Sequence, residues 1–188
     1  MRLFIRHMVS NRCKMVVNDI LNKQGLYCVH IELGEVELSD TMTAESRAEL
    51  KKSLIEFGFE IIENKRSVLI EKIKNTVIEM VHYSNDILKV NFSDYLSEKL
   101  NYDYTYLANV FSEVEGTTIE HFIILHKIER VKELLTYDEM NISEIASTMN
   151  YSSVAHLSYQ FKKFTGLSPI RFKQQKNKKR IPIDKIGI

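Results

Sequence analysis

An internal repeat in the C-terminal half constrains the fold of this chain more than any other feature of its sequence. One set of positions recurs fifty residues later, with Leu107, Phe111, Gly116 and Phe122 returning as Leu157, Phe161, Gly166 and Phe172. An upstream set recurs forty-nine residues later, with Leu96, Leu100, Asn101 and Tyr102 returning as Ile145, Met149, Asn150 and Tyr151. Because apolar residues about four apart share one face of a helix, each copy predicts a helix, a short polar turn and a second helix that a glycine ends.

The second copy indicates which residues its helices bury. Ile145 is expected in the core, and Ala146 supplies a small side chain where two helices approach closely. Leu157 and Phe161 are expected to pack the second helix against the core, so its opposite face is left exposed. This arrangement is typical of a helix-turn-helix, whose second helix presents its N-terminal residues to the major groove of DNA. An ordinary helical hairpin is the alternative, and the second copy and a basic C-terminal end weigh against it.

Two stretches carry a resemblance to a known family. The run from Ile142 to Phe172 closely resembles the C-terminal signature of AraC/XylS-type transcription regulators, and residues 126–135 resemble the connecting helix of that family. The resemblance covers roughly residues 67–176. It implies two helix-turn-helix units, at about residues 92–114 and 142–164, which a rigid helix joins.

The resemblance also implies that two recognition helices, Tyr104–Val114 and Ser153–Phe164, enter successive major-groove segments on one face of the DNA. In this chain Asn109 and Ser112 stand where the family often has an arginine and a following lysine, and Glu113 lies beside them. We therefore expect the first unit to engage DNA more weakly and the second unit to supply more of the electrostatic attraction.

The residues expected to contact DNA follow from the positions of these helices. They are Tyr104, Thr105, Ala108, Asn109, Ser152, Ser153, Val154, Ala155, Ser158, Tyr159, Lys162, Lys163 and Lys173. The Asn109 amide can pair with an adenine edge, and Val154 or Ala155 can contact a thymine methyl group. The basic and hydroxyl groups would contact phosphates.

The first 64 residues show a different pattern, in which strand and helix signals alternate in the order βαββαβ. Residues 27–33 alternate apolar and polar side chains, as a half-buried strand does. From Ser67 onward the apolar period is that of a helix, so we place the domain boundary near residues 64–66. The predicted fold class is an α+β βαββαβ domain over residues 1–64, followed by an all-α double helix-turn-helix domain over residues 65–176.

The βαββαβ order and residues 54–62 resemble heavy-metal-associated ferredoxin-like domains, in which Met-x-Cys-x-x-Cys binds a soft metal ion. Here Ser10 stands in place of the first cysteine, and Cys13 matches the second. Cys13, with Met8 and His7, is thus a metal-site alternative, but a lone cysteine at a helix start more often fills apolar space. We expect no metal and no cofactor.

Positive charge is concentrated at the C-terminal end. Residues 160–188 contain nine lysines and arginines and a single aspartate, although the formal net charge of the whole chain is only +1. We expect residues 177–188 to form a basic tail. A basic end suits a polyanionic partner such as double-stranded DNA, whereas a tail that is merely solvated is the alternative.

Several protein classes are not supported by the sequence. The longest apolar runs, such as residues 122–125, are far shorter than the roughly 20 residues that span a bilayer, and the N-terminus lacks the pattern of a signal peptide. Two cysteines imply no disulfide framework. We therefore expect a cytoplasmic protein with no membrane partner. No nucleophile with a positioned base stands out, so an enzyme is not predicted.

The predicted function is that of a bacterial, sequence-specific DNA-binding transcription regulator, with RNA polymerase as a further partner if it is an activator. A metal-binding carrier or sensor acting through the N-terminal domain is one alternative. A DNA-free interaction scaffold is another. The target sequence, the sign of regulation, an effector and the oligomeric state stay open at this point.

Overall fold

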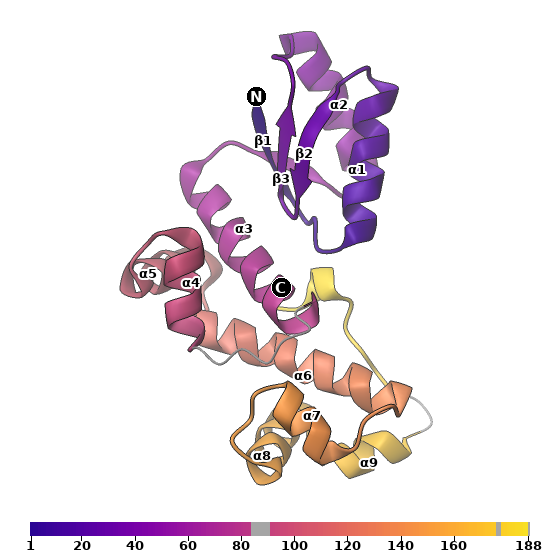
Figure 1. Ribbon diagram of the computed structural model, residues 1–188, viewed down its shortest axis with the longest axis vertical. Coiled ribbons are helices and arrows are strands. Elements are labelled where there is room, and N and C mark those ends of the chain that lie inside the picture. Colours follow the sequence, from indigo (N-terminus) through magenta and orange to yellow (C-terminus); the bar gives the residue numbers. More distant parts are fainter. Residues whose placement is uncertain (84–90, 176–177, 188) are drawn as a thin grey trace. The chain divides into compact units, whose positions relative to one another are not determined.

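The computed structural model describes residues 1–83, 91–175 and 178–187, and it divides the chain into two compact units (Figure 1). The first unit comprises Met1–Asn75, and the second comprises Thr76–Ile188. No helix within the described ranges is long and apolar enough to cross a membrane.

The first unit has the βαββαβ order that the sequence predicts. Its elements are β1 (Arg2–Arg6), α1 (Asn11–Lys23), β2 (Cys28–Glu32), β3 (Glu35–Leu38), α2 (Ala44–Glu56) and β4 (Glu60–Ile62). The sheet has the order β2-β3-β1-β4, and all its pairs are antiparallel. Both helices cover the same face (Figure 1), and the fully buried side chains Leu3, Ile5, Val17, Leu50 and Leu54 fill the space between them and the sheet.

The first unit extends beyond the predicted boundary at residues 64–66 because helix α3 (Lys65–Ile78) begins within it. The Lys72 ammonium group lies 5.0 Å from the centre of the Phe4 ring. The Asn75 side-chain amide donates a hydrogen bond of 3.1 Å to the Leu33 carbonyl. The middle of α3 thus contacts the sheet face that α1 and α2 leave open.

The second unit is helical in its described part. After the end of α3, its elements are η1 (Glu79–Tyr83), α4 (Phe92–Leu100), α5 (Tyr104–Glu115), α6 (Ile119–Tyr137), α7 (Ile142–Thr148), α8 (Val154–Thr165), α9 (Pro169–Gln174) and η2 (Ile183–Lys185). Helix α6 is the central element, with α4 and α5 near its first half and α7, α8 and α9 near its second half (Figure 1).

The sequence repeat corresponds to a repeat in backbone conformation. Asn101 and Asn150 both adopt left-handed conformations in the two turns, with φ of 56° and 53°. Gly116 and Gly166 end α5 and α8 in the same region, with φ of 67° and 77°. Asparagine and glycine tolerate positive φ better than other residues, which explains why these types recur at matching positions.

Each copy buries one aromatic pair. The ring centres of Phe111 and Phe122 lie 5.6 Å apart in the first copy, and those of Phe161 and Phe172 lie 5.5 Å apart in the second. Phe111 and Phe161 are fully buried. The pair joins α5 to α6 in the first copy and α8 to α9 in the second. The second helix of each copy therefore has one buried face and one exposed face.

The C-terminal segment returns to α6. The Ile181 backbone N–H donates to the Glu129 carboxylate at 2.9 Å, and the Arg180 guanidinium lies 3.2 Å from the Glu133 carboxylate. Ile186 is 4% exposed. Composition suggested a basic tail, and in the structure the described end of this segment contacts α6 of the same unit.

Candidate nucleic-acid interface

Helix α5 presents a polar face opposite its buried one. Thr105 and Asn109 are exposed and Ala108 is half-buried. Asp103 caps the helix, since its carboxylate accepts a 2.8 Å hydrogen bond from the Thr105 backbone N–H. The Tyr104 hydroxyl donates to the Glu120 carboxylate, and burial together with that carboxylate raises the pKa of Tyr104.

Helix α8 presents a corresponding face. Val154 and Ala155 are exposed at its first turn, Ser158 is half-buried, and Tyr159 is 71% exposed. An exposed tyrosine of this kind offers a flat apolar surface and a hydroxyl group that can donate or accept a hydrogen bond. The predicted base-facing residues of the second recognition helix are therefore brought together on one open surface.

The two serines before α8 have local hydrogen bonds. The Ser153 hydroxyl accepts from the His156 backbone N–H at 3.0 Å and caps the helix. The Ser152 hydroxyl lies 3.0 Å from His156 Nδ1. These hydroxyl groups sit at a helix N-terminus, where exposed N–H groups and the helix dipole favour a phosphate.

The distribution of charge differs between α5 and α8. Lys162 and Lys163 lie exposed in the last turn of α8, and no ion pair among the described residues involves either ammonium group. Helix α5 contains no lysine or arginine, and it has Glu113 and Glu115 at its C-terminal end. Lys173 is placed differently, because its ammonium group pairs with the carboxylate of Asp138 at the end of α6.

The residues that sequence analysis raised as a metal-site alternative have other contacts. Met8 is fully buried in the core of the first unit, and the Cys13 sulfur lies 3.3 Å from the Ser10 hydroxyl oxygen. His7 has a positive φ of 70° directly after β1. Within residues that the structure describes, no group of three or more His, Cys, Asp or Glu side chains could hold a metal ion.

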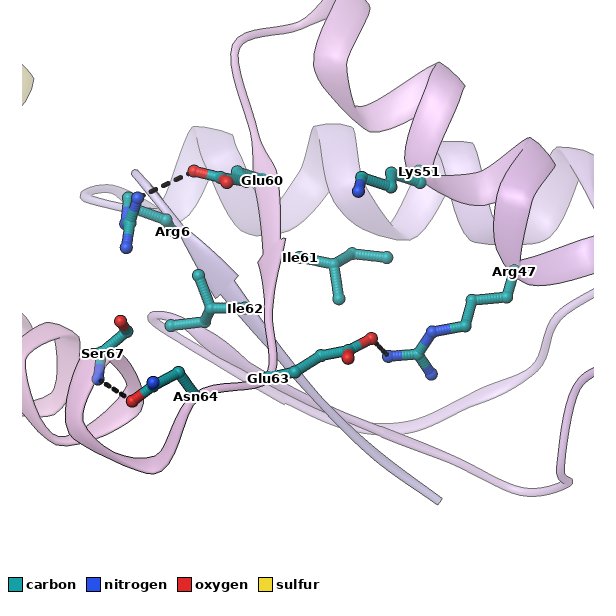
Figure 2. Close-up of a pocket in the computed structure, with 9 residues that line it drawn as sticks. All are labelled: Arg6, Arg47, Lys51, Glu60, Ile61, Ile62, Glu63, Asn64 and Ser67. Carbon is teal, nitrogen blue, oxygen red and sulfur yellow. Dashed lines mark hydrogen bonds and ion pairs between the residues drawn. The ribbon is translucent and has the colours of Figure 1, made fainter. Parts of the chain in front are cut away.

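The first unit contains an open pocket of about 330 Å³ beside the edge strand β4. Figure 2 shows both arginines of this pocket turned toward carboxylates: Arg6 lies 2.8 Å from Glu60, and Arg47 lies 2.7 Å from Glu63. These pairs neutralise much of the positive charge of the arginines. The pocket therefore offers little to attract a polyanion.

Sequence analysis missed Lys127, a buried cation on α6. It is 9% exposed, and it follows Ile119 and Ile123 and precedes Val131 at helical spacing of four residues. This spacing could have predicted that Lys127 is buried, because a lysine in line with three buried apolar residues lies on the inner face of a helix.

The comparisons with known proteins identify the second unit. A family model described as a helix-turn-helix domain matches residues 96–175, which include both turns and the helices α5 and α8. Residues 96–175 thus form a helix-turn-helix domain. The C-terminal domain of AraT, a response regulator from Geobacillus stearothermophilus, has the same fold: it aligns with a TM-score of 0.50 at 24% identity, over 63% of this chain and 92% of that one.

Two curated relatives match part of this chain and are longer than it. The Msm operon regulatory protein of Streptococcus mutans is 27% identical over 101 residues, which are 50% of this chain and 36% of that protein. An uncharacterized HTH-type transcriptional regulator of Staphylococcus aureus is 27% identical over 139 residues, 73% of this chain and 18% of that protein. The matches therefore cover about a third or less of these relatives.

Proposed function

We propose that this protein is a sequence-specific DNA-binding transcription regulator that places α5 and α8 in successive major-groove segments on one face of a duplex. The observation that carries the proposal is the duplication itself. Each copy of the helix-turn-helix buries one side of its second helix and leaves exposed, near the N-terminus of that helix, the side chains that can reach base edges.

The connecting helix supports simultaneous binding by both copies. Helix α6 has 19 residues and would be about 28 Å long at 1.5 Å per residue. Thr118 caps its start, and Asp138 ends it in a left-handed conformation. A continuous helix of that length suits two units that act about one turn of DNA apart, a spacing of roughly 34 Å.

The exposed side chains of the two helix-turn-helix copies would have different roles in DNA binding. We expect Asn109 on α5 and Tyr159 on α8 to discriminate bases, and Lys162 and Lys163 to contact phosphates. Because α8 ends with Lys162 and Lys163 in its last turn, whereas α5 ends with Glu113 and Glu115, the second helix-turn-helix copy supplies more of the binding energy. RNA polymerase is a further partner if the protein is an activator.

Selection of bound sequences from random duplexes tests the proposal and yields the site for mutational work. With that site, Tyr159→Ala should reduce discrimination at one base position by about 1–3 kcal/mol, and Asn109→Ala should do so more weakly at another. Tyr137→Ala is the matched control, because Tyr137 is also exposed and lies at the end of α6. Anisotropy titrations against single-base mutants of the site measure each effect.

The contradicting results are distinct. No enrichment of any sequence would favour the DNA-free scaffold. If a variant loses affinity equally for all sequences, the changed residue, Tyr159 or Asn109, contacts phosphates and does not discriminate bases. A larger loss of discrimination from Asn109→Ala than from Tyr159→Ala would reverse the ranking of the two units.

A further inference from the structure

The second unit contains a pocket of about 410 Å³ that lies between its two helix-turn-helix copies. Residues from α4, α5, α6, α8 and the turn before α8 line it, among them Phe92, Tyr104, Ile123, Lys127, Tyr151 and Gln160. Its size and its largely aromatic and aliphatic walls are those of sites that hold small molecules.

One cation projects among these walls. The Lys127 ammonium nitrogen lies 4.7 Å from the centre of the Phe92 ring and 5.1 Å from that of the Tyr151 ring. The described residues offer this ammonium group no carboxylate at ion-pair distance and no hydrogen-bond acceptor. Ring faces attract a cation, but they accept none of its three N–H groups as a carboxylate oxygen would.

A buried charge of this kind is costly unless an opposite charge accompanies it. Burial alone lowers the pKa of Lys127 to about 8, so the ammonium form still predominates at neutral pH. The polar groups nearby are mostly engaged: the Tyr151 hydroxyl donates to the Gln160 amide oxygen at 2.6 Å, and the Tyr104 hydroxyl donates to the Glu120 carboxylate. Among the residues that the structure describes, no oxyanion lies beside the Lys127 ammonium group.

We propose that this pocket binds a small molecule that carries a carboxylate on a flat apolar body, with the carboxylate paired to the Lys127 ammonium group. Phe92 and Tyr151 would flank the carboxylate end, and Ile123 would contact the apolar body. A small molecule fits better than a DNA backbone, because the ammonium group belongs to a residue that is only 9% exposed.

The position of the pocket gives such a ligand a regulatory role, which rests on the proposed DNA-binding function. Phe92 and Tyr104 belong to the first helix-turn-helix copy, whereas Tyr151, His156 and Gln160 belong to the second. A ligand held by both copies would favour one relative placement of α5 and α8. Because linkage is reciprocal, DNA that prefers that placement would bind the ligand more tightly as well.

The test measures the ionisation of Lys127 in the full chain without DNA. The protein is labelled with ¹³C-lysine, the Lys127 signal is assigned by its loss in Lys127→Met, and its pKa is followed by NMR with and without phenylacetate. We expect saturating phenylacetate to raise the pKa of Lys127 by about one unit or more, since a carboxylate beside the ammonium group favours its charged form. The neutral isostere phenylacetamide should leave the pKa unchanged.

Two further comparisons test whether the apolar walls of the pocket and the Lys127 ammonium group each contribute to binding. Phenylacetate should bind about tenfold or more tightly than acetate, because acetate buries no ring. Lys127→Met should lose binding about tenfold or more, whereas Lys127→Arg should retain it. Lys51→Met, which changes an exposed lysine on α2 of the first unit, should leave binding unchanged. If Lys127→Met fails to fold, the loss of the signal in Lys127→Arg assigns it instead, and the wild-type pKa measurement still decides the question.

An unchanged pKa with phenylacetate, or an equal effect from phenylacetamide, overturns the proposal. A Lys127 pKa that rises only when a DNA duplex is added also overturns it and assigns the ammonium group to the DNA interface. The measurements with phenylacetate, phenylacetamide and acetate contain no DNA. A negative result in them therefore says nothing against the proposed DNA-binding function.

Discussion

Neutralising Lys162 and Lys163 together should weaken DNA binding and make it less sensitive to salt. Both ammonium groups lie exposed in the last turn of α8, and no ion pair among the described residues competes for them. Each lysine that neutralises one phosphate contributes about −0.9 to the slope of log K against log salt concentration. The double change to glutamine should therefore reduce the magnitude of the slope by about 1.8.

The same relation gives the loss of affinity. At about 0.1 M salt, a slope change of about 1.8 corresponds to a loss of roughly 60-fold, or about 2.5 kcal/mol. Because phosphates carry no sequence information, the loss should be equal for the selected site and for unrelated duplexes. Anisotropy titrations at several salt concentrations between about 50 and about 300 mM measure the slope and the affinity together.

The control for this experiment is a second lysine pair with the same spacing. Lys51 and Lys52 are adjacent, exposed and helical, but they lie on α2 in the first unit. Changing both to glutamine alters the net charge by the same amount and should leave the slope unchanged. Equal slope changes from the two double variants would refute the assignment of the phosphate contacts to α8, as would an unchanged slope from Lys162→Gln with Lys163→Gln.

Three further predictions concern stability. Phe161→Ala should lower the free energy of unfolding in urea by about 3–5 kcal/mol because Phe161 is fully buried, and half-buried Phe164 gives a milder control variant. Burial, and less strongly two arginines, lower the pKa of His82 from 6.5 to about 4, so the unfolded state takes up a proton first on acidification. The free energy of unfolding should thus fall by about 2 kcal/mol between about pH 7 and about pH 5, and His82→Gln should remove that part of the pH dependence. Ile186→Ala should cost about 2 kcal/mol in the same assay, and no loss would mean that the packed C-terminal segment contributes nothing to stability.

The helical repeat could be predicted closely because its signals are local. The repeat and the family resemblance predicted helices at Tyr104–Val114 and Ser153–Phe164, and the structure has helices at Tyr104–Glu115 and Val154–Thr165. Glycine at each C-terminus and an asparagine in each turn encode those limits directly. The βαββαβ order of the first unit was predictable for the same reason, since strand alternation and helix ends are read within a few residues.

The features that sequence analysis missed depend on contacts between distant residues. Asn75 belongs to the first unit through its hydrogen bond to Leu33, forty-two residues away, and local periodicity says nothing of such a contact. The backbone of Ile181 meets Glu129 in the same way, across fifty-two residues. Lys127 lay on a readable apolar stripe, but its aromatic neighbours come from two separate helix-turn-helix copies, which only the fold brings together.

Hydroxyl-radical footprinting on the selected duplex tests most directly whether both recognition helices bind one site. The proposed function predicts two protected segments on the same face of the duplex, with centres about 10 base pairs apart, because each recognition helix would occupy its own major-groove segment. Tyr159→Ala should weaken protection in one segment, and Asn109→Ala in the other. A single protected segment, or two segments on opposite faces of the duplex, would contradict the binding of α5 and α8 to successive major-groove segments on one face.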